Sequence, residues 1–272
     1  SKRARRGAVL GLCLCAAAGL GMHLLPGGAP VGCTQEDLAD TRAVMAVQAS
    51  VSGSTDAQSG AAADKVVYLT FDDGPSATTE SVLDTLKAEG VPATFFVMAA
   101  DNNEEYLPLL ERTVQEGHLI ALHTCSHDYK SIYKSPDAYW DDLQKLREKL
   151  LPYVPADQEI KWLRFPGGST NTVSRRYGGK GLMKQLKAEV EQKGWHWVDW
   201  NVCAEDAVGG HPSAGTIYRN VVHETGQQTN CIVLMHDSSS THTTAEALPD
   251  IIRWYADNGY TFLTVAEALP LG

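Results

Sequence analysis

Four short segments of this chain carry side chains suited to acid, base or metal chemistry, and each follows an apolar run. Asp72 and Asp73 come directly after the run Val66–Phe71 and precede Gly74-Pro75, a dipeptide that favours a turn. Adjacent carboxylates repel each other, so without a counter-charge the pKa of one of them would rise. The pair is a candidate catalytic or metal site, although an ordinary turn containing Asp explains the segment equally well.

His123 and His127 follow the second of these runs. Histidines four residues apart lie on one face of a helical turn and can share one ion. Together with Asp73 they offer two imidazoles and one carboxylate, a set that leaves coordination positions open for water and substrate. We therefore expect a divalent metal cofactor, and this donor set accepts zinc, cobalt, nickel or iron. Cys125, between the two histidines, is expected to fill space.

Arg164 and His236 end two further apolar runs. An arginine among carboxylates can orient one of them bidentately. A histidine at a strand end can act as an acid or base, with a buried carboxylate holding its tautomer. Taken alone, Arg164 is better explained as a member of a structural ion pair than as a catalytic residue. For His236, a structural role and a catalytic role are equally plausible.

The elements that must position these residues alternate between strand-like and helix-like patterns from Lys65 onward. The expected strands are 66–71, 93–98, 119–122, 162–165, 195–200, 231–235 and 260–265. The expected helices are 79–89, 103–116, 136–150, 180–193, 213–225 and 243–258. Glycines at 90, 117, 194 and 259 stand where left-handed C-caps belong. The alternation predicts an α/β fold with a parallel sheet, either a barrel of seven units or an open doubly wound sheet. In a barrel, the ends of the strands gather at one face.

The N-terminal part of the chain predicts export. Basic residues at positions 2–6 precede an uncharged apolar run over residues 8–25, the order found in signal peptides and membrane anchors. We expect 1–33 to be such a segment, with a possible membrane tether through 8–25, and 34–64 to be a flexible linker. Residues 65–272 would then form one catalytic domain. The protein would act outside the cytoplasm, secreted or anchored at the cell surface.

The composition excludes some partners. The net charge is −10, and beyond the first residues the sequence shows no run of Lys and Arg of the kind that tracks phosphates, so no nucleic-acid partner is expected. The six cysteines are scattered at unrelated spacings and do not form a disulfide framework. A Cys125–Cys203 bond is conceivable but not expected. The protein is expected to be a monomer.

Four segments, taken in order, closely resemble the motifs of the polysaccharide deacetylase family, also called the NodB homology domain or carbohydrate esterase family 4. They are Thr70–Pro75, His123–His127, Arg164–Pro166 and Leu234–His236. The resemblance spans the whole stretch from Val66 to Leu269. It implies a distorted (β/α)7 barrel and a metal-dependent hydrolase that removes acetyl groups from N-acetylglucosamine polymers or O-acetylated xylan.

The resemblance also implies roles for individual residues. Asp72 would be the catalytic base, positioned by Arg164, and His236 the general acid, oriented by Asp206. Asp199 is a weaker candidate for that orienting carboxylate. The implied metal ligands are Asp73, His123 and His127. The implied substrate contacts are Gly167, through its N–H facing the oxyanion, and Leu234, which would line the acetyl pocket.

The chain departs from the family's pattern in two places that bear on this site. In the fourth motif, Cys203 stands where the family has Asp, and Ala207 where it has Trp. In the third motif, Gly167 stands where many members carry Tyr, so an aromatic contact to the sugar is lost. Trp200, or another aromatic residue, is our candidate to replace the tryptophan that the fourth motif lacks at Ala207, and so to contact the substrate.

We expect hydrolysis of N-acetyl groups, with the N-acetylglucosamine of peptidoglycan as first choice and a chitin-like polymer as the second. Three rivals stay open: an O-acetyl esterase of the xylan type, a catalytically inactive carbohydrate-binding member, and a structural surface protein without metal. The loops 171–179 and 238–243 are expected to discriminate between polymers.

Overall fold

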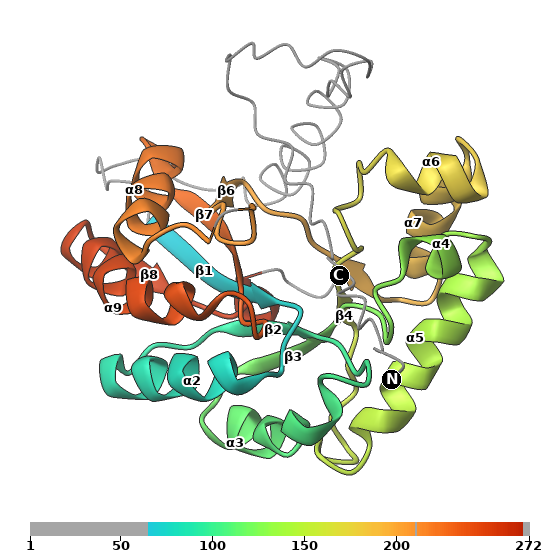
Figure 1. Cartoon of the computed structure of the whole chain (residues 1–272), viewed down its shortest axis with the longest axis horizontal. Helices are drawn as coiled ribbons and strands as arrows, with labels where there is room; N and C mark the ends of the chain where they lie inside the picture. The colour runs from blue at the N-terminus through green and yellow to red at the C-terminus, as the bar shows by residue number, and fades with distance from the viewer. Residues whose placement is uncertain (1–64, 210, 269–272) are drawn as a thin grey trace, which may run out of the picture.

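The computed structural model describes residues 65–209 and 211–268 (Figure 1). Its strands are β1 (Lys65–Asp72), β2 (Thr94–Val97), β3 (Leu119–Leu122), β4 (Trp162–Leu163), β5 (His196–Trp197), β6 (Val202–Cys203), β7 (Asn230–His236) and β8 (Tyr260–Phe262). Its helices are α2 (Ala77–Glu89), η1 (Glu104–Tyr106), α3 (Leu109–Gln115), α4 (Tyr129–Ile132), α5 (Pro136–Leu150), α6 (Val173–Gly178), α7 (Leu182–Gln192), α8 (Ala214–Thr225), α9 (His242–Asp257) and α10 (Val265–Ala268).

All strand pairs are parallel, and they form one sheet in the order β5-β4-β3-β2-β1-β7-β6, with β8 pairing β1. The sheet curves into a half-barrel with helices outside it, and β5 and β6 form its two edges (Figure 1). The expected α/β fold of the distorted (β/α)7 type is therefore confirmed. The register places Asp72 at the end of β1 opposite Phe96 of β2 and His236 of β7.

The two faces of β1 are both buried, as parallel strands require. Val67, Leu69 and Phe71 belong to the large core between the sheet and the helices. Tyr68 belongs to a smaller core with Phe96, on the inner side of the curved sheet. Because side chains alternate along a strand, Thr70 and Asp72 share the inner face with Tyr68. The first candidate carboxylate thus ends a strand that is fixed from both sides.

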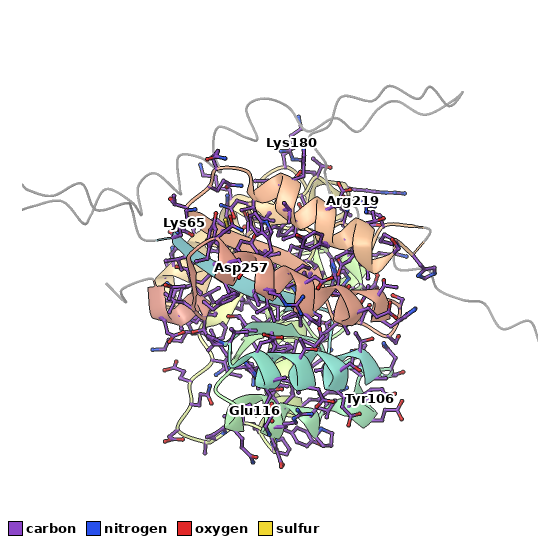
Figure 2. All side chains as sticks on the ribbon, turned by 90° about the vertical axis from the view of Figure 1, so that its left-hand side faces the viewer. Lys65, Tyr106, Glu116, Lys180, Arg219 and Asp257 are labelled. Carbon is purple, nitrogen blue, oxygen red and sulfur yellow. The ribbon has the colours of Figure 1, made fainter. Side chains whose placement is uncertain are left out.

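The outer helices lie side by side in the order α8, α9, α2 and α3 (Figure 2). Helix α2 follows the candidate carboxylates at once: Ser76 is its N-cap and forms a capping box with Thr79. The glycines at 90, 117, 194 and 259 all have positive φ, between 67° and 83°, so the expected left-handed helix ends are confirmed.

Four expected elements differ clearly in the structure. The expected strand 162–165 ends at Leu163, and the expected strand 260–265 ends at Phe262, with α10 starting at Val265. The expected helix 103–116 is interrupted, with η1 ending before Pro108 and α3 starting after it, because proline lacks the N–H that a continuous helix needs. The expected strand 195–200 is shorter. After β5, residues 198–201 cross from one edge of the sheet to the other, where β6 begins. The short helices α4 and α6 were not expected.

Within residues 65–209 and 211–268, no helix is both long and apolar enough to cross a bilayer. The expected export segment (1–33) and linker (34–64) lie outside the described residues.

Candidate active site

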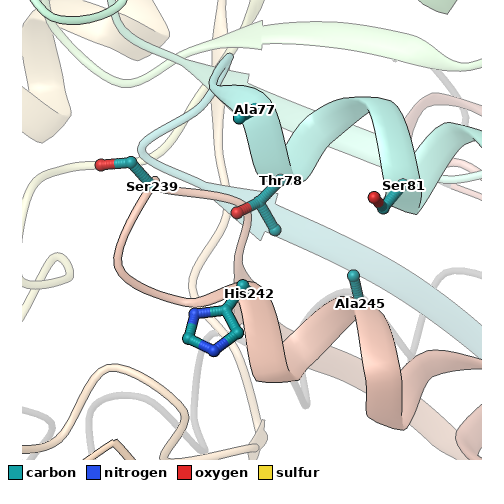
Figure 3. Close-up of a pocket in the computed structure, with 6 residues that line it drawn as sticks. All are labelled: Ala77, Thr78, Ser81, Ser239, His242 and Ala245. Atoms are coloured by element: carbon teal, nitrogen blue, oxygen red, sulfur yellow. The ribbon is translucent and has the colours of Figure 1, made fainter.

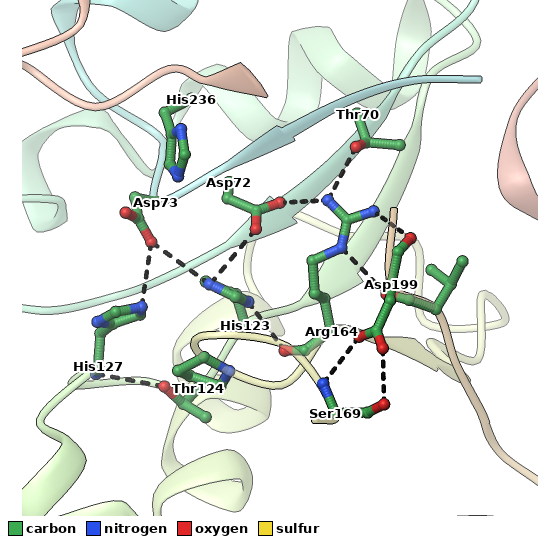
Figure 4. A network of polar contacts seen from close by, with 12 residues as sticks. Thr70, Asp72, Asp73, His123, Thr124, His127, Arg164, Ser169, Asp199 and His236 are labelled. Atoms are coloured by element: carbon green, nitrogen blue, oxygen red, sulfur yellow. Dashed lines mark hydrogen bonds and ion pairs between the residues drawn. The ribbon is translucent and has the colours of Figure 1, made fainter. Parts of the chain in front are cut away.

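The ends of β1 and β3 bring three possible metal ligands together. Asp73 follows β1, and His123 and His127 follow β3. The Oδ1 atom of Asp73 lies 3.5 Å from Nε2 of His123 and 3.6 Å from Nε2 of His127 (Figure 4). One ligand atom from each of the three residues lies within 4.8 Å of the others. This is the set that the sequence predicted.

The donor atoms of this cluster suit a cation. Oδ1 of Asp73 and Nε2 of His127 are buried and have no hydrogen-bond partner among the described residues. Buried polar atoms without partners are costly, and they are rare in native structures. Ligand atoms that each lie about 2.0–2.2 Å from one zinc ion are separated by distances similar to those seen here. The arrangement therefore fits a divalent ion held by two imidazoles and one carboxylate.

His123 is held in the tautomer that metal binding requires. Its Nδ1 lies 2.8 Å from the carbonyl oxygen of Arg164, which can only accept a hydrogen bond, so Nδ1 carries the proton. Nε2 then directs its lone pair towards Asp72 and Asp73. Complete burial lowers the pKa of His123 to about 3, so the ring is neutral at physiological pH. A neutral imidazole with its second nitrogen anchored is the usual form of a ligating histidine.

The loops that carry the cluster have strained backbones fixed by side chains from elsewhere. Asp73 and His127 have φ values of 73° and 52°, in the left-handed region that side chains other than glycine rarely adopt. The amide group of Asn103 donates to the carbonyl of Asp73, at 3.0 Å. The carboxylate of Asp142 accepts the N–H of Cys125, at 2.6 Å. Both contacts come from helical segments outside the motifs.

Asp72 lies beside the cluster and is paired with Arg164. Its Oδ1 accepts from Nη1 of Arg164 at 2.8 Å, and its Oδ2 lies 3.6 Å from Nε2 of His123 (Figure 4). Asp72 and Arg164 are 3% and 0% exposed. Burial raises the pKa of Asp72 above its usual value, and the charges of Arg164 and His236 oppose that rise without cancelling it.

Arg164 contacts Asp72 through one nitrogen only, so the expected bidentate pair is not formed. Its Nε donates to the carbonyl of Val198 at 3.0 Å, and its Nη2 to the carbonyl of Asp199 at 3.1 Å. Nη1 also donates to the Thr70 hydroxyl at 2.8 Å. The guanidinium is thus surrounded by acceptors on three sides and cannot rotate to give a second contact.

His236 and Asp206 form a buried pair at the end of β7. Nδ1 of His236 lies 2.8 Å from Oδ1 of Asp206, and the N–H of His236 donates to Oδ2 at 2.7 Å. The hydroxyl of Thr244, at the start of α9, donates to the same Oδ2. Asp206 occupies this position although Cys203 and Ala207 depart from the family pattern. Its partners fix both the ring and the backbone of His236.

Asp199 does not orient His236. Its Oδ1 accepts the N–H of Ser169 at 2.9 Å, and its Oδ2 accepts the Ser169 hydroxyl at 2.6 Å. The weaker alternative that the sequence left open is therefore wrong. The carboxylate instead holds the loop after β4, on the far side of Arg164 from His236 (Figure 4).

Gly167 lies in that loop, which is held at several points. Tyr133 donates to the carbonyl of Pro166 at 2.7 Å, and Asn171 donates to the carbonyl of Gly168 at 2.7 Å. Gly167 has a φ of 77°, and a Cβ added there would lie 3.1 Å from the Tyr129 hydroxyl. The ring of Tyr129 thus fills the space beside Gly167. No described residue accepts the Gly167 N–H.

Trp200 and Leu234 lie on the inner side of the sheet near these groups. The Trp200 ring is half-buried, packs against Gly168 and lies 5.5 Å from the Arg164 guanidinium. Leu234 pairs with Thr70 of β1 and Cys203 of β6, and it alternates along β7 with Val233 and Met235 of the outer core. It is 2% exposed. Both residues are therefore close to the catalytic groups.

Cys125 packs into the large core, and its Sγ contacts the carbonyl of Ala99 at 3.4 Å. It contributes no ligand to the cluster of Asp73, His123 and His127. The described cysteines, Cys125, Cys203 and Cys231, are free thiols, so the conceivable Cys125–Cys203 bond is absent.

The loop 238–243 lines a shallow pocket of about 300 Å³ between the starts of α2 and α9 (Figure 3). The lining residues are Ala77, Thr78, Ser81, Ser239, His242 and Ala245. None of the candidate ligands or catalytic residues lines this pocket.

The residues that hold the site in place could not be read from spacing. Asp142 and Thr244 lie on helices, Tyr133 directly follows α4, and Asn103 directly precedes η1. Each contacts a motif residue that is far from it or follows a different strand. Only the composition at strand ends was visible in the sequence, and these four side chains do not end strands.

A family model described as polysaccharide deacetylase matches residues 59–203. This range contains every candidate ligand, as well as Asp72 and Arg164, whereas Asp206 and His236 lie beyond it.

Curated relatives and solved structures extend the similarity through most of the chain. The Bacillus subtilis protein YheN, whose name refers to polysaccharide deacetylation, is 33% identical over 211 residues, 76% of this chain and 69% of the relative. A peptidoglycan-N-acetylglucosamine deacetylase of Bacillus cereus is 29% identical over 202 residues, 73% of this chain and 68% of the relative. The catalytic domain of a peptidoglycan N-acetylglucosamine deacetylase from Eubacterium rectale superposes with a TM-score of 0.71 at 34% identity, covering 81% of this chain and 96% of that domain.

Proposed function

The chain belongs to the polysaccharide deacetylase family, and on that premise we propose that it hydrolyses the N-acetyl groups of N-acetylglucosamine residues in peptidoglycan. The observation that carries the proposal is the ion-binding cluster of Asp73, His123 and His127 beside an Arg164-paired Asp72. Two of the relatives described above are named for this reaction. Because peptidoglycan lies outside the cell membrane, we also propose that the protein acts outside the cytoplasm.

We propose that Asp73, His123 and His127 hold a divalent ion, with zinc as first choice. The support is their partnerless buried atoms and the neutral tautomer of His123. When bound, such an ion polarises a carbonyl group and makes water more acidic.

Asp72 is the proposed general base. Its carboxylate accepts a proton from the water that attacks the acetyl carbon. Arg164 fixes the carboxylate through the 2.8 Å contact to Oδ1 and leaves Oδ2 to face the ligand cluster. A base with a pKa raised by burial holds the transferred proton more firmly than a solvent-exposed aspartate would.

His236 is the proposed general acid. In its protonated form it donates to the glucosamine nitrogen as the carbon–nitrogen bond breaks, and Asp206 stabilises the imidazolium. The Gly167 N–H is the proposed donor to the oxyanion. Leu234 and Trp200 are the proposed contacts to the acetyl group and the sugar. One water is consumed for each acetate and free amine formed.

A second candidate function is hydrolysis of O-acetyl esters. One relative, from Pseudobutyrivibrio xylanivorans, is named a bifunctional xylanase/deacetylase and is 28% identical over 212 residues. An ester is easier to cleave than an amide, so the same groups would suffice. Acetylated xylan therefore belongs in the experiment that tests the proposal.

The test measures acetate release by the full chain loaded with zinc, on peptidoglycan, chitin oligomers and acetylated xylan. We expect release from peptidoglycan, lost on chelation and restored by zinc. Asp72→Asn should lower kcat by at least about 10²-fold, the usual size of a general base's contribution. Asp257→Asn, which changes an exposed carboxylate at the end of α9, is the matched control and should be fully active.

Undiminished activity in Asp72→Asn or after complete chelation would overturn the mechanism. Release from acetylated xylan alone would favour the esterase. Zinc binding without acetate release from any of the three polymers would favour an inactive carbohydrate-binding member.

A further inference from the structure

Two segments beside the candidate site carry positive charge only. Residues 129–135 and 169–188 contain seven of the 23 lysines and arginines of the chain and none of its 33 acidic residues. The net charge of the whole chain is −10, so the charge of these two segments is opposite in sign to that of the chain. We call their cations the basic rim: Lys130, Lys134, Arg175, Arg176, Lys180, Lys184 and Lys187.

The two segments are packed together, so their charges add. Helix α4, in the first segment, contacts α6, in the second, and the two lie next to each other in Figure 1. Gly178 approaches the Tyr133 carbonyl so closely that an added Cβ would lie 2.5 Å from it. Helix α6 in turn contacts α7, which carries the last two cations of the rim. The basic rim is therefore one surface.

This surface borders the candidate active site. Helix α4 begins two residues after His127, and Tyr133, which directly follows the helix, donates to the Pro166 carbonyl. Asn171, which leads into α6, binds the carbonyl of Gly168. Both segments are thus attached to the loop that contains Gly167. A polymer with an acetyl group at the catalytic residues would have its neighbouring units within reach of the rim.

Four cations of the basic rim are lysines on the surface of the molecule. Lys130, Lys134, Lys180 and Lys184 are exposed, and none of them forms an ion pair with a described residue. Lys180 extends from the upper edge of the molecule in Figure 2. Asp128, which precedes the first segment, caps the start of α4. Glu189, which follows the second segment, accepts from the ring N–H of Trp140 and the amide of Gln185. The like charges of these four lysines repel one another, so they suit a surface whose counter-charge arrives with a ligand.

We propose that the basic rim binds anionic groups of the polymer next to the acetylated sugar, so that the substrate class is an anionic amino-sugar polymer. This inference rests on the proposed deacetylase function and narrows it. In a bacterial wall the anionic oxygens come from peptide carboxylates or from attached phosphodiesters. Neutral polymers such as chitin and xylan offer neither, and would gain nothing from the rim.

The experiment compares two variants of the full chain that lose the same charge. The rim variant carries Lys130→Gln, Arg176→Gln and Lys180→Gln. The control variant carries Lys145→Gln, Arg219→Gln and Arg253→Gln, on the exposed surfaces of α5, α8 and α9. The substrates are native peptidoglycan, the same material with its carboxylates amidated, the same material freed of phosphate by hydrofluoric acid, and neutral chitin oligomers.

We expect the rim variant to raise KM for native peptidoglycan about tenfold, the combined size of a few exposed ion contacts, with kcat nearly unchanged. Its KM for chitin oligomers should stay as it is, and the control variant should match the unmodified protein throughout. Salt at about 0.5 M should reproduce the effect of the rim variant, because it screens exposed charges. If the basic rim binds carboxylates, amidation of the peptidoglycan removes the difference in KM between the rim variant and the unmodified protein. If it binds phosphates, removal of phosphate does so.

Equal loss on charged and neutral substrates, or no loss in the rim variant, would overturn the inference. Sedimentation with native and amidated peptidoglycan measures binding without catalysis. If no polymer releases acetate, the proposed function is wrong. Weaker co-sedimentation of the rim variant with native peptidoglycan would still support anion binding by the basic rim. Duplex DNA that displaces peptidoglycan as well as a soluble anionic glycan does would show a nucleic-acid surface instead.

Discussion

At the scale of single residues, Asp199 joins two functions that the proposed mechanism needs together. Its carboxylate binds both the N–H and the hydroxyl of Ser169, and its carbonyl accepts from Arg164. The first contacts hold the loop of Gly167, and the last helps to hold the partner of Asp72. Asp199 is therefore a positioning residue for both the base and the oxyanion donor.

We predict that Asp199→Ala lowers kcat by about 10–100-fold, because a shift of about 1 Å in a catalytic group costs up to that much. KM and zinc affinity should change little, since the ligands Asp73, His123 and His127 do not contact Asp199. Asp199→Asn should recover most of the activity, because the amide oxygen can accept the Ser169 N–H and the amide nitrogen can donate to its hydroxyl. Steady-state kinetics and a zinc titration of both variants give the readouts.

Ser169→Ala in each background completes a double-mutant cycle. Strong coupling between the two positions is the expected outcome. Equal losses in the Ala and Asn variants, or a parallel loss of zinc affinity, would contradict a positioning role.

The candidate site itself was largely predictable from residue types at strand ends. Asp72, Asp73, His123 and His127 follow strands with high apolar content, so topology alone implies that they meet. The partner of Asp199 was not predictable, because a carboxylate in a loop gives no sign of which N–H groups it will face. For the same reason the role of Tyr133 was not predictable: its hydroxyl donates to the Pro166 carbonyl from the end of α4, a helix that the sequence did not predict.

At the scale of elements, the loop after β7 packs against the turn after β1. The carboxylate of Asp237 lies so close to Gly74 that an added Cβ would be 2.1 Å from its Oδ2. Oδ2 accepts the Thr79 hydroxyl at 2.6 Å, and Oδ1 is buried without a partner among the described residues. Burial, opposed by the Thr79 contact and assisted by the charge of Asp73, raises the pKa of Asp237 to about 7.

This pKa predicts how stability depends on pH in the chelated protein. Because the folded pKa lies above the unfolded value of 3.8, the native state binds a proton more tightly. The stabilisation is complete below about pH 4 and is lost as the pH rises through about 7. Asp237→Asn removes this dependence. The free energy of unfolding of this variant should therefore exceed that of the unmodified protein by an amount that grows from pH 5 to pH 8. Each unit of pKa difference corresponds to about 1.4 kcal/mol.

Urea unfolding of both proteins at several pH values, with chelator present, measures the effect. Curves of unfolding free energy against pH that run parallel for the two proteins would refute the assignment. Asp250→Asn, a change to an exposed carboxylate of α9, serves as the control and should follow the unmodified protein.

Element types were predicted better than element ends. The strand 119–122 has the predicted bounds because both of its faces are apolar and a glycine precedes it closely. The region 195–200 was read as one strand because it is rich in Trp and Val. Its second half instead turns its carbonyls to Arg164, a tertiary contact that no local pattern encodes.

At the scale of the whole molecule, the candidate metal ligands follow two strands, β1 and β3, that are not adjacent in the sheet, with β2 between them. An ion bound by Asp73, His123 and His127 would therefore link distant parts of the fold. We predict that zinc raises the melting temperature of the chelated protein. At one hundred times the dissociation constant, binding adds about 2.7 kcal/mol to the free energy of unfolding. Calorimetry with and without zinc measures the shift.

His127→Ala should abolish most of this shift, whereas Asp257→Asn should keep it in full. An unchanged shift in His127→Ala would place the ion elsewhere.

The half-barrel is completed at one place by a side chain rather than by a strand. Between β5 and β6 the carbonyls of Val198 and Asp199 receive their hydrogen bonds from Arg164, where a neighbouring strand would have offered N–H groups. The proposed partner of the base is thus also part of the scaffold. A relative that binds glycans without hydrolysing them would still need this arginine, because its hydrogen bonds to the backbone hold the sheet edge together. An engineer who wants an inert glycan-capturing reagent should likewise replace Asp72 and leave Arg164 alone.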